Sequence, residues 1–242
     1  MYWQADPGTE LKLFLFEFKK AGESSTTNTN PRLPIAPASK ATVQLDDVQK
    51  ECRRDTGSLN PEWEADVLLG HADVAESHEP IVFCTRSLER HQSTAERSLY
   101  ARALLLAGRT VESRAVFEEL ALLNDSHSNL VLGFLYSNYK EKAPVKALHH
   151  FLSAYVQGEP YGAYGLGLYF ELGMHDVPDY TQAAVMYKQV PSLREAQFRL
   201  AQLYYFGLGV RKDASEAMVL YRKSAAGGYQ LAIDLLESND TT

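Results

Sequence analysis

Histidines are the first side chains to consider, because clusters of them bind metals and carry protons. His149 and His150 are adjacent, so on a helix their side chains point about 100° apart and cannot bind one metal ion together. His71 and His78 share a helix face with two carboxylates nearby, but no further cluster completes a site. We therefore expect no metal site and no cofactor.

The two cysteines, Cys52 and Cys84, are too few for a disulfide framework and lack the short spacing of a zinc site. Cys84 follows the apolar residues Ile81, Val82 and Phe83, a setting that suits a packed thiol better than a nucleophile. We expect a reducing compartment and no nucleophilic cysteine.

Residues 162–167, Gly-Ala-Tyr-Gly-Leu-Gly, superficially resemble a phosphate-binding loop. They follow no strand and lie inside a predicted helix, so the context of a phosphate cradle is absent. The sequence also lacks the Gly-x-Ser-x-Gly, Walker and dinucleotide motifs. We expect no catalytic residue, no cofactor-binding residue and no enzyme activity.

Composition narrows the class of protein further. The chain has 242 residues, of which 45% are hydrophobic and 23% charged, which excludes disorder throughout. Its net charge of -7 disfavours nucleic acid as a partner. The apolar stretch at residues 11–18 is too short to span a bilayer, and we expect no integral membrane segment. Because the first residues resemble no targeting signal, a cytoplasmic location is expected, or an organelle-associated one if the natural N-terminus is missing.

The elements that would position any site change along the chain. Residues 1–20 form a short apolar N-terminal segment, and residues 21–42 have the Ser, Thr, Asn and Pro content of a flexible linker. Residues 43–125 are predicted to be helical, and helix-start signals recur through residues 126–242. Capping boxes are expected to begin helices at Ser93, Ser192 and Asp213.

An internal repeat dominates the second half. Leu132, Leu166 and Leu200 are 34 residues apart, and each precedes a small residue and then an aromatic. Later in each unit an alanine is followed four residues on by an aromatic. These pairs are Ala147 with Phe151, Ala183 with Tyr187, and Ala217 with Tyr221. We expect the small residue to let the first helix of each unit approach the second, and the aromatics to fill the space between units.

The pattern of residues 196–228, with Ala196, Leu200, Tyr204 and Gly207 as anchors, resembles a Sel1-like repeat, a relative of the tetratricopeptide repeat. Residues 162–189 and 129–158 are similar but less complete, and residues 100–121 resemble a tetratricopeptide unit. The resemblance therefore implies Sel1-like repeats over residues 126–242 and tetratricopeptide-like repeats over residues 43–125. The resemblance implies an all-α fold, an α/α right-handed superhelical solenoid of Sel1-like and tetratricopeptide-like helix hairpins.

The function implied by the resemblance is that of a non-catalytic adaptor or scaffold with a protein partner. In such solenoids the first helices line a concave groove that holds a peptide or a helix. The alternative is that several of the expected groove residues pack between units. These residues are Leu130, Phe134, Tyr164, Leu168, Glu171, Phe198, Gln202 and Tyr205.

Two further functions remain open. The chain could be an assembly or quality-control factor for an organelle or membrane protein complex, tethered by residues 11–18. A lower-ranked alternative is a β-lactam-type hydrolase of the Sel1-like family. The members of the family linked to that activity resemble secreted repeat proteins with a cysteine pair in each unit. Residues 126–242 contain no cysteine, which disfavours the hydrolase.

Overall fold

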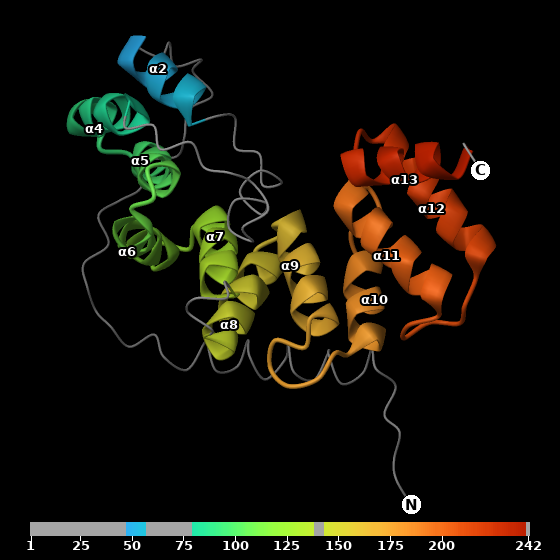
Figure 1. Ribbon diagram of the computed structural model, residues 1–242. Coiled ribbons are helices and arrows are strands. Elements are labelled where there is room, and N and C mark those ends of the chain that lie inside the picture. Colours follow the sequence, from blue (N-terminus) through green and yellow to red (C-terminus); the bar gives the residue numbers. More distant parts are fainter. Residues whose placement is uncertain (1–46, 57–78, 138–142, 241–242) are drawn as a thin grey trace, which may run out of the picture. The chain divides into compact units, whose positions relative to one another are not determined.

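The computed structural model in Figure 1 describes residues 47–56, 79–137 and 143–240, and within these ranges the chain forms helices and turns without a strand. The segments predicted at residues 11–18 and 21–42, and the pair His71 and His78, lie outside the described residues. The helices are α2 (Asp47–Asp55), α4 (Glu79–His91), α5 (Thr94–Leu106), α6 (Thr110–Ala121), α7 (Ser126–Ser137), α8 (Pro144–Val156), α9 (Pro160–Glu171), α10 (Tyr180–Lys188), α11 (Arg194–Phe206), α12 (Ala214–Ala226) and α13 (Gln230–Asp240).

Each described helix packs on the next one along the chain, as expected for a stack of helix hairpins. The hairpins α5–α6, α7–α8, α9–α10 and α11–α12 follow one another, and α6 also packs on α7. Residues 47–242 form one compact unit. The chain is thus an all-α helical repeat solenoid, and the predicted fold class is confirmed.

Local capping fixes where several helices begin. The Ser93 hydroxyl accepts a hydrogen bond from the Glu96 amide, and the Asp213 carboxylate accepts from the amides of Ser215 and Glu216. Both confirm the predicted starts. The start predicted at Ser192 is wrong, because α11 begins two residues later and its N-terminal flanking residue, Leu193, has no side chain that could cap.

Close approach of paired helices depends on glycine. A Cβ built on Gly133 of α7 would lie 2.4 Å from the ring of Phe151 on α8, and one built on Gly165 of α9 would lie 2.3 Å from the same ring. The phenyl ring therefore fills a space that two neighbouring helices leave open. This is the packing that the repeat predicted for the small residue and the aromatic.

Candidate partner-binding surface

Five of the eight predicted groove residues lie in the interior. Leu130, Phe134, Tyr164, Leu168 and Phe198 are all buried. The rings of Phe134 and Phe151 meet edge to face with centroids 5.0 Å apart, so the Phe134 side chain packs on the second helix of its own unit. The structure therefore favours the alternative, packing within the repeat stack, for these five positions.

Phe198, on the first helix of the hairpin α11–α12, packs against its neighbours in the chain. Its ring lies 5.4 Å from that of Tyr221 on α12 and 5.2 Å from that of Tyr229, which precedes α13. Only 8% of the residue is exposed. Phe198 therefore packs against α12 and the residue before α13, and it offers little surface for the expected direct contact with a partner.

Glu171 holds three helices together. From the end of α9, its carboxylate accepts a hydrogen bond from the Tyr187 hydroxyl of α10 at 2.5 Å and pairs with the Arg199 guanidinium of α11 at 3.3 Å. Burial, followed by the charge of Glu171, raises the pKa of Tyr187, so the phenol stays protonated and donates. Glu171 and Gln202 are both partly buried. The contacts of the Glu171 side chain connect α9 with α10 and α11.

Exposed apolar side chains occur where the first helices of two successive hairpins, α9 and α11, end. Leu172, directly after α9, is 54% exposed, whereas Tyr205 and Phe206, the last residues of α11, are 45% and 61% exposed. Val177, in the turn after α9, is also exposed. We call these four residues the carboxyl-end edge. Of the predicted groove residues, only Tyr205 is exposed and not buried or partly buried.

Two neighbouring turns carry the carboxyl-end edge, and a close backbone contact joins them. Gly209, in the turn after α11, has φ +63° and lies so near α10 that a Cβ there would sit 2.2 Å from the carbonyl carbon of Tyr180. Only glycine fits both the conformation and the space. The contact sets the α11–α12 turn against the start of α10, next to the α9–α10 turn.

Sequence reasoning missed Leu172 and Phe206, although a signal was present. They occupy the same position in successive units, 34 residues apart, and each directly precedes a glycine with positive φ, Gly173 or Gly207. A large apolar residue at the end of a helix, just before its terminating glycine, is not needed for packing within the unit. Its recurrence therefore indicates a surface.

The histidine pair is built into the packing between helices. His150 stacks on Tyr136 with ring centroids 5.5 Å apart, and its Nδ1 lies 3.0 Å from Oδ1 of Asn129. Burial lowers the pKa of His150 to about 4 and also lowers that of His149. Within residues 47–56, 79–137 and 143–240, no group of three or more histidine, cysteine or acidic side chains could hold a metal ion.

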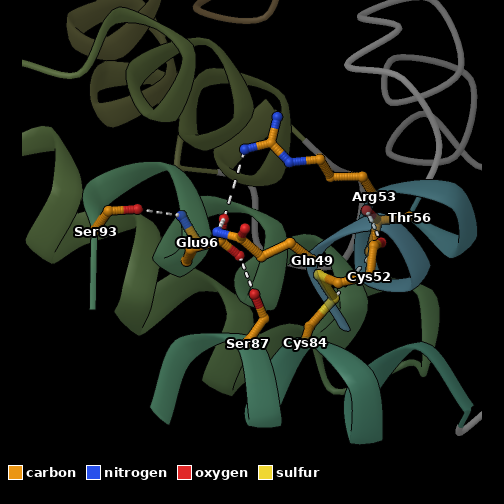
Figure 2. Close-up of polar contacts among 8 residues, drawn as sticks. All are labelled: Gln49, Cys52, Arg53, Thr56, Cys84, Ser87, Ser93 and Glu96. Atoms are coloured by element: carbon orange, nitrogen blue, oxygen red, sulfur yellow. Dashed lines mark hydrogen bonds and ion pairs between the residues drawn. A yellow bond between two sulfur atoms is a disulfide. The ribbon is translucent and has the colours of Figure 1, made fainter. Parts of the chain in front are cut away.

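The cysteines differ from expectation. Cys52 of α2 and Cys84 of α4 form a disulfide (Figure 2), so Cys84 is not a free packed thiol. Two cysteines were too few for a framework, yet one bridge needs only the right distance between backbones. Because disulfides persist in oxidising surroundings, the bond argues against the expected reducing compartment and cytoplasmic location.

Beside the disulfide, one buried carboxylate collects polar groups from two helices. Glu96 of α5 accepts hydrogen bonds from Gln49 Nε2 and Ser87 Oγ, and Arg53 lies 3.5 Å away as an ion pair (Figure 2). Gln49 and Arg53 come from α2, and Ser87 comes from α4. Arg53 balances the charge of the carboxylate, and Gln49 and Ser87 meet its need for hydrogen-bond donors, so no ligand is required there.

Comparison with known proteins agrees with this architecture. A family model described as Sel1 repeat matches residues 160–189 and 194–229, which hold the hairpins α9–α10 and α11–α12. These two segments are therefore similar to Sel1 repeats. A search of curated proteins found no match.

A solved structure of a Sel1 repeat protein has a similar fold. The crystal structure of a Sel1 repeat protein from Oxalobacter formigenes is similar at 19% sequence identity and a TM-score of 0.54, over 74% of this chain and 78% of that chain. A protective antigen of uropathogenic Escherichia coli with an SLR fold is similar at 16% identity and a TM-score of 0.46, over 90% of this chain and 50% of that chain. The first likeness shows that a helical-repeat fold extends beyond the two matched segments.

No helix in the described ranges combines the length and the apolar character needed to cross a membrane.

Proposed function

We propose that this Sel1-repeat chain is a non-catalytic scaffold that binds a protein partner through the carboxyl-end edge. The observation that carries the proposal is the exposure of Leu172 and Phe206 at equivalent positions of adjacent repeats. Large apolar side chains exposed together on a folded protein mark an interaction site more often than a neutral surface.

The edge has the make-up of a protein-binding site. Tyr205 and Phe206 form an edge-to-face pair with ring centroids 5.1 Å apart, and aromatic side chains are enriched among residues that dominate binding energy. Next to Leu172 in the sequence, Glu171 pairs with Arg199 and supplies partly buried polar groups. A peptide or helix with apolar side chains at regular spacing would match the two apolar positions.

Photo-crosslinking from the edge tests the proposal. A benzophenone side chain is introduced at Phe206 or at Leu172 of the full chain, and at Val219 on α12 as a control of similar exposure. We expect one protein from the source cells to be crosslinked from both edge positions but not from Val219. Equal crosslinking from all three positions would contradict an edge-specific partner.

The captured partner then allows an affinity measurement. Leu172→Ser together with Phe206→Ser is expected to weaken binding at least tenfold, since central apolar anchors each contribute about 1 kcal/mol or more. The matched control is Val111→Ser together with Val219→Ser, which changes exposed residues of the second helices α6 and α12. An unchanged dissociation constant in the edge variant would remove the carboxyl-end edge from the binding site.

A further inference from the structure

Helix α2 is too short to be stable without packing on other helices. It has nine residues, and isolated helices shorter than about 12–15 residues are marginal in water. Its packing partners in the described part of the chain are α4 and α5. Whatever fastens α2 to those helices therefore decides whether it forms.

The described contacts of α2 with other helices come from one face of this helix. Gln49, Cys52, Arg53 and Thr56 are spaced three and four residues apart and so lie on the same side of the helix. Gln49 and Arg53 contact the Glu96 carboxylate, and Cys52 is bonded to Cys84. Thr56 donates its hydroxyl proton to the Cys52 carbonyl and closes the last turn.

The disulfide lies at the centre of this contact. Both cysteines are 0% exposed, and with Leu99 and Ala103 they form an apolar cluster against which further side chains pack. Because neither sulfur is accessible, the bond is not suited to rapid exchange with external thiols while the helices are closed. Its position is that of a structural disulfide and not of a catalytic pair.

We propose that the Cys52–Cys84 disulfide makes α2 a covalently attached cap on α4 and α5, and that the chain folds in an oxidising compartment as a substrate of thiol–disulfide exchange. The oxidant is a protein or small molecule that carries a reactive disulfide. The bond between Cys52 and Cys84 forms as the oxidant's disulfide breaks. Two electrons and two protons pass from the cysteine thiols to the oxidant, which leaves as a dithiol.

Among the described residues, α2 comes before the first helix hairpins of the repeat stack. A terminal hairpin has no neighbour to cover its apolar side, and solenoids close that side with an atypical element. Here α2 covers the cluster of Cys84, Leu99 and Ala103, with Glu96 as its polar anchor. A link between residues 32 apart disfavours the open chain roughly 10²- to 10³-fold in the chain-entropy model.

Thiol trapping in the source cells tests the compartment. Cells are quenched in acid, free thiols are alkylated, and the intact mass of the full chain is measured before and after reduction. We expect no alkylated cysteine before reduction and two after it. Alkylation of both cysteines before reduction in most molecules would overturn the assignment to an oxidising compartment.

Hydrogen exchange of the purified full chain tests the cap. After mild reduction, amides of α2 are expected to exchange at least a hundredfold faster, while amides of α9 to α12 keep their rates. The double variant Cys52→Ala/Cys84→Ala should match the reduced chain and show no response to the reductant, which controls for side effects. Equal protection of α2 in oxidised and reduced wild-type chains would overturn the cap, whether or not the alanine variant folds.

Discussion

Gly167 of α9 and Tyr187 of α10 are complementary in shape, since a Cβ on the glycine would lie 2.2 Å from Cε1 of the tyrosine ring. The same relationship recurs one unit earlier between Gly133 and Phe151. The leucine–small residue–aromatic signal and the alanine–aromatic signal of the sequence are thus two halves of one contact. This contact sets how closely the two helices of a hairpin approach.

Replacement of Gly167 by alanine should destabilise the fold. The added methyl group overlaps the Tyr187 ring, which is buried and held by its hydrogen bond to Glu171, so the ring cannot move aside freely. We expect a loss of about 1–3 kcal/mol in the free energy of unfolding, measured by urea denaturation. A double-mutant cycle with Tyr187→Leu tests the cause. If Gly167→Ala costs as much without the ring as with it, steric overlap is not the reason.

The repeat period predicted this contact because two residues of one hairpin must fit each other in every copy. It could not predict which face of the inner helices is exposed. Residues 161–169 of α9 are buried on all sides, so the helix is apolar all round and its pattern marks no single outer face. Both Phe198 and Tyr205 were predicted from the sequence to line the groove, although only Tyr205 is exposed.

The disulfide could not be predicted from the local sequence around either cysteine. Cys52 and Cys84 are 32 residues apart, and bonding requires their backbones to come close in space, which no spacing rule expresses. The capping pattern at Ser93 predicted the start of α5, and the hydrogen bond from the Glu96 amide to the Ser93 hydroxyl confirms it. The role of the Glu96 carboxylate, as the anchor for Gln49 and Arg53, arises only when α2 packs on α5.

Phe198 and Phe206 of α11 should respond differently to truncation. Phe198→Ala removes an enclosed ring and is expected to cost about 3–5 kcal/mol of stability. Phe206→Ala removes a ring that is 61% exposed and should change stability by no more than about 0.5 kcal/mol. Urea unfolding of both variants measures the difference. Similar costs at the two positions would contradict the assignment of Phe198 to the interior and Phe206 to the surface.

Glu96→Ala should destabilise the N-terminal helices. It removes a buried acceptor shared by Gln49 and Ser87 and leaves the Gln49 amide and the Ser87 hydroxyl without this partner. We expect a cost of about 2–4 kcal/mol. Arg53→Ala is the matched control, because the Arg53 side chain is partly exposed and its ion pair should contribute about 1 kcal/mol or less. Thermal unfolding of the oxidised chain gives both values, and equal losses would contradict a central role for Glu96.

His150 connects stability to pH through its surroundings. Its ring stacks on Tyr136, and Nδ1 faces the Asn129 amide oxygen. The Lys146 ammonium lies over the Tyr136 ring, with Nζ 4.7 Å from the ring centroid. The Tyr136 hydroxyl donates a hydrogen bond to the Glu118 carboxylate. Burial is the main reason why the pKa of His150 falls from 6.5 to about 4. The neighbouring His149 and then Lys146 lower it further, whereas the charge of Glu118 opposes the shift.

The folded chain should therefore lose stability as the pH falls from about 6.5 to about 4. In this window the unfolded state takes up a proton at His150 that the folded state excludes, so protonation favours unfolding. We expect this residue to account for about 1–2 kcal/mol, because solvent screens a partly exposed ring. Urea unfolding at a series of pH values should give a shallower pH dependence for His150→Asn than for the wild type. His175→Asn, at an exposed histidine, is the control. If both variants keep the wild-type slope, His150 is not the titrating group.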